Sequence, residues 1–443
     1  MNYINVNLRE KTGKIKALNG VNCAPYDLTR GSNQTYIDKY FREGNIPYSR
    51  LHDCCGVYGG HNFVDIPNVF RNFDADENDP KNYDFHYTDE YIKSIVDAGT
   101  DIVYRLGITI EWGSKNYTAV PPKDFKKWAR ICEHIIMHYN KGWADGFNFN
   151  ITYWEIWNEP ENPPMWTGTK EEFFELYKIT SIYLKEKFPD LKIGGYGSCG
   201  FYTNTRKNPS PLLQTFIPYF EDFLKMCKEE KAPLDFFSWH IYSADEKEVL
   251  SHAEFARKTL DKYGFQETEA HLNEWNIHME GRGFLSKHTM EGASFNGAVM
   301  CILQQTDYVD KAMYYCFSLH SSYTGLLNQN DTSVVDPSWY PFVAFGYLAK
   351  LGTAVKTDCD GDRIYAASAT DNQESGVLIT NYRCEDNNVC LHVEGGKSKN
   401  KVSLLILNNE KRLEEEFTLS FDSASFDLQF KLPKENLAYI RIK

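Results

Sequence analysis

The sequence predicts an α/β protein in which a (β/α)8 barrel is followed by a small antiparallel β-sandwich. Three observations favour this fold. From about residue 15 to residue 350, eight short apolar runs alternate with segments of helical periodicity. After Lys350 the helical pattern stops, and apolar and polar residues alternate with a period of two. The length of 443 residues is enough for two or three domains.

The eight apolar runs are the candidate barrel strands. In chain order they read LNGVNC, YSRLH, DIVYRLG, ITYWEIW, LKIGGYG, LDFFSWHIY, AHLNEW and KAMYYCFS. Between them, apolar residues recur three and four positions apart, most clearly from Phe125 to Tyr139. Another helix is expected after Thr169, a suitable N-cap, because Glu171 and Glu172 favour the positive end of a helix dipole. Strand–helix units in series are typical of a (β/α)8 barrel.

The last part of the chain is predicted to be a separate β-domain, residues 351–443. The segments VSLLILN, FTLSFDS, FDLQFKL and LAYIRIK read as strands, with no helical stretch between them. We expect residues 1–14, which contain YINVNLRE, to add a strand to this sandwich. The catalytic barrel would then span residues 15–350.

Composition and charge disfavour several classes of protein. A formal net charge of −13 and scattered lysines argue against nucleic acid as a partner. No apolar run approaches the ~20 residues of a membrane span, so no membrane partner is expected. The eleven cysteines lack zinc-ribbon spacing and favour thiols in a reducing compartment. We expect a cytoplasmic protein as the chain is given, or a periplasmic or secreted one if a leader preceded it, and the oligomeric state stays open.

The segment YWEIWNEPENPPMW, residues 153–166, places the carboxylates of Glu155 and Glu159 among three tryptophans. Apolar surroundings disfavour the charged form, so Glu155 and Glu159 are either neutralised by partners or tuned for proton transfer. By strand parity, Glu155 lies inside the barrel, where we expect it to pair with Arg50 or Arg105. Glu159 shares that parity and emerges at the C-terminal mouth, where barrels carry their active sites.

A second carboxylate is expected to face Glu159 across the barrel mouth. Glu274, in AHLNEWN, ends the seventh strand, three steps around the ring from the fourth. Two opposed carboxylates about 5 to 5.5 Å apart are what a retaining glycosidase needs, one as nucleophile and one as acid/base. Two unrelated loop acids are the alternative.

These segments resemble glycoside hydrolase family 39, within the superfamily of (β/α)8 retaining glycosidases that carry catalytic glutamates on strands four and seven. The resemblance rests on SRLHD, WEIWNEP with the following MWTGTKEEFFELYK, FFSWHIY and NEWN. It implies that Glu159 is the general acid/base and Glu274 the nucleophile, and that Asn158 hydrogen-bonds the sugar 2-hydroxyl. The predicted double displacement uses neither a metal nor an organic cofactor.

Other polar side chains are expected around these carboxylates. His240 and Tyr242 share a parity on strand six and are candidates to donate to Glu274, with a satisfied core histidine as the alternative for His240. His52 ends strand two and resembles the family histidine that contacts sugar hydroxyls, although pairing with Asp53 is an equally simple interpretation.

The backbone at the end of strand four cannot continue as a regular strand. Asn158 and Glu159 are neighbours and cannot both point inward from a regular strand, so we predict a bulge or sharp twist there. Trp157 or Trp166 is expected to form an apolar wall that raises the pKa of Glu159 and keeps it protonated. We count Trp166 among the substrate-binding residues.

The exit of strand eight departs from the family pattern. Xylosidases of the family run there from a Trp into a Ser-Asp stretch and further acidic residues. Here Tyr315, an expected substrate-binding residue, replaces the Trp, and Leu319, His320, Ser321, Ser322 and Tyr323 replace the acidic stretch, while Ile108 replaces a Phe after strand three. A lost carboxylate clamp changes the sugar that is accepted, not the reaction.

The sequence thus predicts a retaining glycoside hydrolase acting by double displacement on a β-xyloside-like or related glycoside, with exo action expected. Two alternatives stay open. One is a carbohydrate-binding protein on a catalytically weak barrel. The other is an α-L-iduronidase- or arabinosidase-like specificity; a uronate would need cationic donors, for which Lys115, Arg282 and Lys287 in mouth loops are candidates. A metal hydrolase is disfavoured, since no His-Glu-x-x-His spacing occurs.

Overall fold

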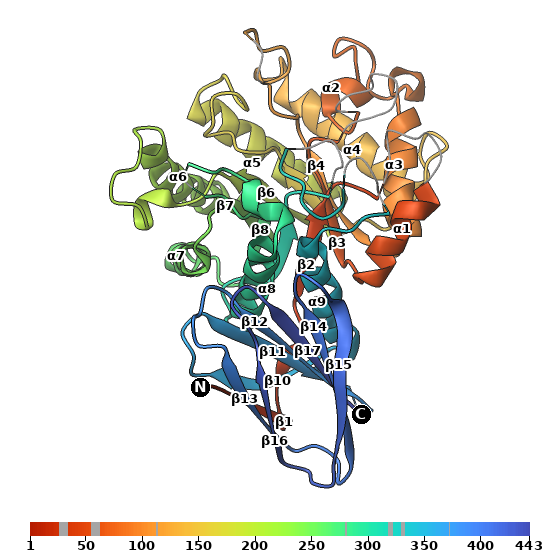
Figure 1. Ribbon diagram of the computed structural model, residues 1–443. Helices are drawn as coiled ribbons and strands as arrows, with labels where there is room; N and C mark the ends of the chain where they lie inside the picture. Colours follow the sequence, from red (N-terminus) through yellow and green to blue (C-terminus); the bar gives the residue numbers. More distant parts are fainter. Residues whose placement is uncertain are drawn as a thin grey trace.

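A computed structural model describes residues 1–25, 34–54, 63–111, 114–279, 281–317, 322–328, 333–371 and 373–443. The barrel with its surrounding helices forms one part of the molecule, and a β-sheet built from both ends of the chain forms the other (Figure 1). None of the described helices is both long and apolar enough to cross a membrane.

Eight parallel strands close into a barrel, which confirms the predicted fold class. Neighbouring strands pair in chain order, and the last strand pairs with the first. Each strand overlaps one of the eight apolar runs of the sequence. The strands are β2 (Ala17–Asn22), β3 (Tyr48–Leu51), β4 (Asp101–Leu106), β5 (Tyr153–Ile156), β6 (Lys192–Ser198), β7 (Phe236–Tyr242), β8 (Glu269–Asn276) and β9 (Lys311–Tyr314).

Helices follow the barrel strands and cover their outer faces. The long ones are α1 (Gln34–Glu43), α3 (His86–Asp97), α4 (Phe125–Lys141), α5 (Lys170–Lys187), α6 (Leu213–Glu230), α7 (Glu246–Tyr263), α8 (Met290–Gln304) and α9 (Tyr340–Leu351). Shorter turns are α2 (Ile66–Val69), η1 (Pro80–Asn82), η2 (Tyr202–Asn204), η3 (Leu285–His288) and η4 (Pro337–Trp339). The predicted N-cap Thr169 begins α5 with a full capping box, in which Glu172 is the partner.

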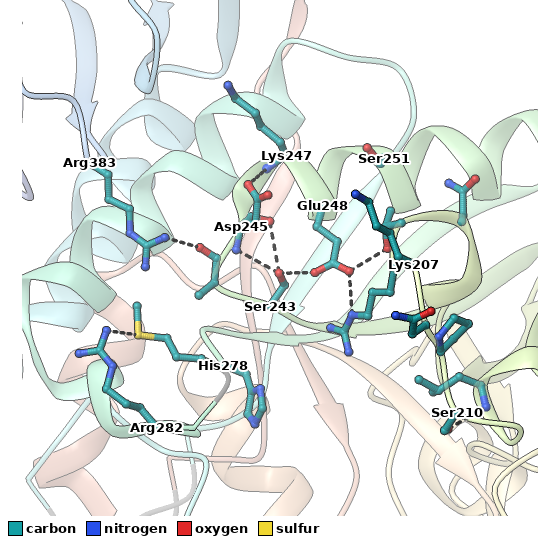
Figure 2. Close-up of a pocket in the computed structure, with 18 residues that line it drawn as sticks. Lys207, Ser210, Ser243, Asp245, Lys247, Glu248, Ser251, His278, Arg282 and Arg383 are labelled. Carbon is teal, nitrogen blue, oxygen red and sulfur yellow. Dashed lines mark hydrogen bonds and ion pairs between the residues drawn. The ribbon is translucent and has the colours of Figure 1, made fainter.

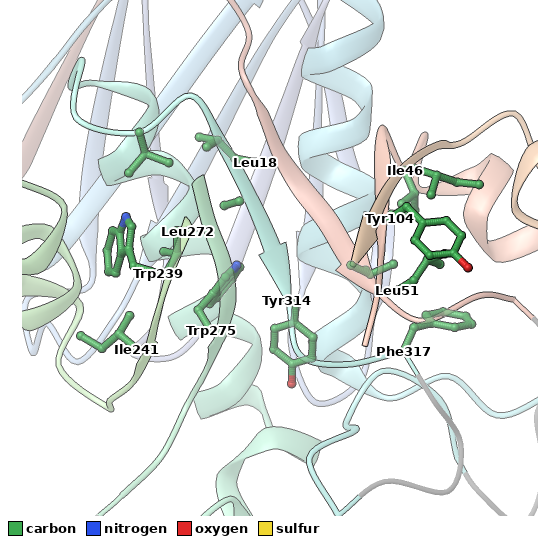
Figure 3. Packing of buried hydrophobic residues seen from close by; sticks show 14 of the residues in the cluster. Leu18, Ile46, Leu51, Tyr104, Trp239, Ile241, Leu272, Trp275, Tyr314 and Phe317 are labelled. Carbon is green, nitrogen blue, oxygen red and sulfur yellow. The ribbon is translucent and has the colours of Figure 1, made fainter. Parts of the chain in front are cut away.

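Strand alternation separates an apolar outer layer from a polar interior. Trp239 and Ile241 of β7 and Leu272 of β8 belong to the main core between strands and helices (Figure 3). The intervening His240 is buried but lies outside that core, because successive side chains of a strand point to opposite faces. A small apolar cluster, made by Val103, Tyr153, Phe236 and Met313, fills the interior near the strand starts. The polar groups of the interior therefore lie towards the strand ends.

The second part is one nine-stranded sheet in the order β15-β14-β17-β12-β11-β10-β1-β13-β16. Val6, Leu391, Leu404 and Ile440, from strands far apart in this order, share one apolar cluster, so the sheet folds over its own core. The strands are β1 (Asn2–Lys14), β10 (Thr353–Cys359), β11 (Ile364–Thr370), β12 (Ser375–Asn381), β13 (Asn388–Glu394), β14 (Asn400–Leu407), β15 (Arg412–Phe421), β16 (Phe426–Lys431) and β17 (Leu437–Ile442).

One pairing in this sheet differs from the antiparallel arrangement that the sequence predicts. β1 pairs antiparallel with β10 but parallel with β13. No short turn has to join β1 to either neighbour, since both lie more than 300 residues away, so a parallel pair meets no connection constraint.

The sheet is fastened to the barrel close to the end of β7. The buried carboxylate of Glu246, at the start of α7, accepts hydrogen bonds from Arg363 at 2.9 Å and Tyr365 at 2.6 Å. Tyr382 donates its hydroxyl to the carbonyl oxygen of Ala244 at 2.6 Å. The sheet thereby braces a loop that leads out of the barrel mouth.

Removing the cap of α5 should destabilise the barrel measurably. Thr169→Ala deletes the oxygen that accepts the Glu172 N–H, and the expected loss in free energy of unfolding is about 1 kcal/mol. Urea unfolding followed by circular dichroism measures it. Thr169→Ser keeps the acceptor and should unfold like the parent; equal losses in both variants would contradict a capping role.

Candidate active site

A buried arginine joins the ends of three barrel strands. Arg50 in β3 is fully buried, and its guanidinium makes three short contacts. Its Nε donates to Glu155 at 2.6 Å, its Nη1 to Glu274 at 2.7 Å and its Nη2 to Asn158 at 2.6 Å. One planar cation with donors in a fixed fork thus sets the spacing of two glutamates and an asparagine.

Glu155 lies inside the barrel below the mouth. It is fully buried and accepts hydrogen bonds from Ser238 and Asn273, both at 2.5 Å, besides the contact to Arg50. Burial raises its pKa, but Arg50 and the Ser238 hydroxyl outweigh burial, so the pKa is lowered. Of the two arginines considered as its partner, Arg50 makes the contact, whereas Arg105 pairs with an aspartate in the loop after β3.

Glu274, near the end of β8, is held by a donor on each carboxylate oxygen. Oε1 accepts from Arg50 at 2.7 Å, and Oε2 accepts from the Tyr242 hydroxyl at 2.7 Å. His240 Nδ1 lies 3.6 Å from Oε2, and His52 Nε2 lies 3.9 Å from Oε1. A donor on each oxygen fixes the orientation of this carboxylate at the barrel mouth.

Glu159 also contacts His240, the histidine that lies near Glu274. Its Oε1 lies 2.7 Å from His240 Nδ1, and its Oε2 accepts from Asn162 at 3.1 Å. Burial raises the pKa of Glu159, but the hydrogen bond and the attraction of His240 outweigh it, so the pKa is lowered. Burial lowers the pKa of His240, and attraction to Glu274 and Glu159 raises it more. Both shifts favour a proton on His240 over one on Glu159 in the unliganded protein.

A local twist lets two neighbouring residues face the site, as the sequence predicts. β5 ends at Ile156, and φ is 71° at Trp157 and 45° at Glu159. The Glu159 N–H donates to the Gly197 carbonyl at 3.0 Å, which holds this backbone against β6. Gly197 has φ of 66°, and a Cβ there would lie 2.9 Å from Asn158 Oδ1, so only glycine fits beside the site.

Trp157 and Trp166, expected to form an apolar wall that raises the pKa of Glu159, lie in the main core, and that pKa is lowered instead. Trp157 donates its indole N–H to the Met165 carbonyl and Trp166 donates to that of Thr169, each at 2.9 Å. Their rings pack on each other, 5.1 Å between centroids, and both residues are buried in the main core. The parity argument fails because alternation stops where the regular strand ends. Contact of the buried Trp166 with substrate stays a prediction.

His52, Asp53 and Tyr315 form a second polar group beside Glu274. His52 Nε2 lies 3.3 Å from Asp53 Oδ1, and Tyr315 donates its hydroxyl to Asp53 Oδ2 at 2.5 Å. Burial raises the pKa of Asp53 to about 6, although the Tyr315 hydroxyl opposes the shift. Sequence reasoning treated Asp53 only as a partner of His52; its place directly after a strand-end histidine is the signal that could have found it.

Aromatic rings form a wall from the site towards the loop after β8. Tyr323 lies with its ring 5.2 Å from Tyr315, 5.5 Å from Tyr242 and 4.3 Å from Phe284, measured between centroids. No motif marks Phe284. Within the stretch that departs from the family pattern, Leu319, His320 and Ser321 lie outside the described residues, and Ile108 is buried.

The three cationic donors considered for a uronate substrate make other contacts. Lys287 donates its ammonium to the Ser322 carbonyl, and Lys115 lies over the ring of Tyr117 at 4.9 Å. Arg282 is largely exposed, with a guanidinium nitrogen 3.7 Å from Glu291. None of the three has a recorded contact with Glu159 or Glu274.

One oxygen or nitrogen atom from each of Glu159, His240 and Glu274 lies within 4.8 Å of the other two. Among the described residues this is the group whose geometry could hold a metal ion. Arg50 already places a positive charge on Glu274, and His240 Nδ1 bonds Glu159, so the donor set fits proton sharing better than a cation.

Glu161, two residues beyond Glu159, is a buried carboxyl group that the sequence did not single out. Its Oε1 accepts from the Ser198 hydroxyl at 2.9 Å and the Cys199 N–H at 2.8 Å. Its Oε2 has no hydrogen-bond partner among the described residues. Burial raises the pKa of Glu161 to about 7 despite these donors.

Comparison with known proteins identifies relatives of one kind. The family model described as glycosyl hydrolases family 39 matches residues 43–332. A β-xylosidase of Geobacillus stearothermophilus is 23% identical over 293 residues, which cover 58% of this chain and 53% of that enzyme, so the chain matches about half the length of this relative.

Solved structures with this fold cover the whole chain. A glucosidase from Croceicoccus marinus has a TM-score of 0.83 at 21% identity, over 100% of this chain and 99% of that one. A β-xylosidase from Caulobacter crescentus has a TM-score of 0.70 at 14% identity, over 100% and 99%. At these identities the likeness concerns the fold.

Removing Glu155 should lower the stability of the fold, because Glu155 is expected to be structural and not catalytic. Glu155→Ala leaves the buried Arg50 guanidinium without its Nε partner, and the expected loss is about 3–5 kcal/mol in free energy of unfolding, measured with urea. Glu155→Gln retains an acceptor for Ser238 and should lose less. An alanine variant with parental stability and no turnover would make Glu155 a catalytic residue instead.

Glu161 should make stability depend on pH. Its pKa is about 7 in the folded protein against an ordinary 4.5, so between these values the folded state binds more protons than the unfolded state, and stability falls as pH rises. Glu161→Gln cannot ionise, so its stability relative to the parent should rise from pH 4.5 to pH 8 by on the order of 3 kcal/mol. Urea midpoints at both pH values measure this; a difference independent of pH would contradict it.

Proposed function

Since this chain belongs to glycosyl hydrolase family 39, we propose that it is a retaining glycoside hydrolase that acts on a β-xyloside-like or related glycoside. The observation that carries the proposal is the approach of Glu159 and Glu274, whose carboxylate oxygens come within 4.8 Å. Retaining enzymes hold their carboxyl groups about 5 to 5.5 Å apart, whereas inverting enzymes leave ~6.5 to 9.5 Å for a water molecule. The close approach of the two carboxylates therefore supports the retaining class over the inverting one.

In the first step, Glu274 attacks the anomeric carbon of the sugar. A bond forms between that carbon and a carboxylate oxygen of Glu274, while the bond to the leaving oxygen breaks. Arg50 and Tyr242 orient the carboxylate of Glu274 for attack. Glu159 delivers a proton to the leaving oxygen, and His240 supplies that proton through its 2.7 Å contact with Glu159.

In the second step, water enters from the side that the leaving group has vacated. Glu159 takes a proton from the water, the water oxygen bonds to the anomeric carbon, and the ester bond to Glu274 breaks, so the configuration is retained. Glu274 carries no charge while it is esterified, which removes the main attraction that raises the pKa of His240.

The remaining polar groups support recognition of one sugar ring. Arg50 donates a hydrogen bond to Asn158 Oδ1, so the amide nitrogen of Asn158 is the atom that donates to the sugar 2-hydroxyl. His52, Asp53 and Tyr315 form the group suited to other hydroxyls, and charged hydrogen bonds of this kind are worth roughly 1.5 to 3 kcal/mol each. We propose exo action, in which one sugar is released from the chain end; product analysis on a defined oligosaccharide tests that assignment.

The two carboxylates should fail differently when removed. Glu274→Ala should abolish turnover with every leaving group, because no glycosyl-enzyme can form. Glu159→Ala should still glycosylate Glu274 from an activated aryl glycoside and then stall, losing about 10²–10⁴-fold in rate. Azide needs no general base, so it should restore turnover of the Glu159 variant and yield a glycosyl azide of retained configuration. A screen of aryl glycosides with steady-state kinetics and NMR of the azide products measures both.

The products also discriminate between role assignments. Azide that attacks directly in the Glu274 variant should give the opposite configuration. If the two configurations came out reversed, the roles of Glu159 and Glu274 would be exchanged. Sugar binding without turnover of any aryl glycoside would instead favour a carbohydrate-binding protein on this barrel.

A further inference from the structure

A large pocket adjoins the candidate active site. It has a volume of about 1120 Å³, and eighteen residues line it (Figure 2). They come from the loops after β6, β7 and β8, from the first turns of α6 and α7, and from the sheet, which contributes Arg383. Loops that follow strands lie at the C-terminal face of a barrel, so the pocket opens on the same face as Glu159 and Glu274.

One residue connects the pocket to the catalytic carboxylates. Tyr242 donates its hydroxyl to Glu274 at 2.7 Å, while its backbone carbonyl accepts from Arg206, a pocket residue, at 3.4 Å. Its ring packs on Phe284, which in turn packs on His278 at the pocket wall. Tyr242, Phe284 and His278 thus form a continuous row of rings from Glu274 to the wall of the pocket.

The pocket is cationic although the protein is acidic. The formal net charge of the chain is −13. Among the described residues that line the pocket, the carboxylates are Asp245 and Glu248, and the cations are Arg206, Lys207, Lys247, Arg282 and Arg383. Two of these cations pair with acids outside the lining, Lys247 with Asp362 and Arg383 with Glu291, both at 2.8 Å. Such a local reversal of sign favours an anionic ligand.

The two carboxylates of the lining are already engaged by the protein. Glu248 accepts hydrogen bonds from Thr205 at 2.7 Å, Ser243 at 2.5 Å and Arg206 at 3.0 Å, and so fixes the loops after β6 and β7 together (Figure 2). Asp245 caps α7 by accepting the Lys247 N–H at 3.1 Å. Their oxygens therefore accept hydrogen bonds from the residues that form the pocket.

Two of the cations are available to a ligand. Lys207 is exposed and has no ion pair or hydrogen bond to any described residue. Arg282 is 59% exposed and lies 3.7 Å from Glu291, a carboxylate that Arg383 contacts more closely at 2.8 Å. Lys207 and Arg282 project from different loops at opposite sides of the pocket in Figure 2.

We propose that this pocket is a leaving-group subsite for an anionic sugar, whose carboxylate or sulfate group is attracted by the positive charges of Lys207 and Arg282. The inference rests on the proposed function, since it assigns the substrate class to the leaving-group side of that reaction. The pocket, at about 1120 Å³, is slightly larger than typical small-molecule sites of about 300–1,000 Å³, so it has room for a sugar.

Kinetics with matched substrates test this subsite. The substrates share the non-reducing sugar that an aryl-glycoside screen selects and differ in the leaving sugar: a uronate, its neutral methyl ester, or a sulfate ester. The parent should have higher kcat/KM on the charged substrates, and salt should reduce that preference. Lys207→Gln and Arg282→Gln should each lower it by up to about fivefold, with turnover of the neutral ester and of the aryl glycoside unchanged.

Lys262→Gln is the matched control, because it removes the same charge from the far end of α7. It should leave every substrate unaffected. Equal kcat/KM on neutral and charged leaving sugars, or loss of charge preference in the control as well, overturns the subsite. The uronate and the sulfate ester separately report which anionic group the pocket prefers.

If the parent turns over no glycoside, the proposed function fails. The anionic-sugar site is then tested by measuring binding. Saturation-transfer NMR with glucuronate, glucose 6-sulfate and glucose then uses the intact protein. The parent should bind a charged sugar in preference to glucose. Loss of this preference in the Lys207→Gln, Arg282→Gln double variant supports an anionic-sugar site. Equal binding of all three sugars, no binding of a charged sugar, or no effect of the double variant overturns it.

Discussion

The buried guanidinium of Arg50 is the interaction on which the rest of the site depends. It lets Glu155 and Glu274 occupy one interior, where two like charges without a cation would be unfavourable. Because the same group also holds Asn158, any displacement of β3 is transmitted to the ends of β5 and β8. Stability and site geometry are therefore coupled through one side chain.

His240 links the two carboxylates that Arg50 does not bring together. Its Nδ1 lies between Glu159 and Glu274, at 2.7 and 3.6 Å, so its affinity for a proton depends on the charge of both. A histidine in such a position responds to the state of its neighbours as the local charge changes. The acid/base assignment thus depends on this ring and not on an apolar wall. The lowered pKa of Glu159 in the unliganded protein is therefore compatible with a later role as acid.

Local sequence patterns predicted the barrel and the candidate carboxylates. They could not predict contacts between segments that are distant in the sequence. Apolar runs and helix caps such as Thr169 act within a few residues, so they can be read directly from the sequence. Strand parity predicted the interior place of Glu155 but failed at Trp157, where a positive φ ends the alternation. The role of Asp53 depends on the Tyr315 hydroxyl, 262 residues away, and the sequence has no signal for that pair.

The parallel pairing of β1 also affects the order in which the chain can fold during synthesis. Its partners are β10 and β13, and 380 residues separate Lys14 from Glu394. At ~5–20 residues per second, β1 waits roughly 20 to 80 s on the ribosome before both partners exist. β9 ends at Tyr314, so the barrel can close during that time, while β1 remains an unpaired strand. Charged residues in its second half, Arg9, Glu10 and Lys11, discourage the nascent strand from pairing with other chains.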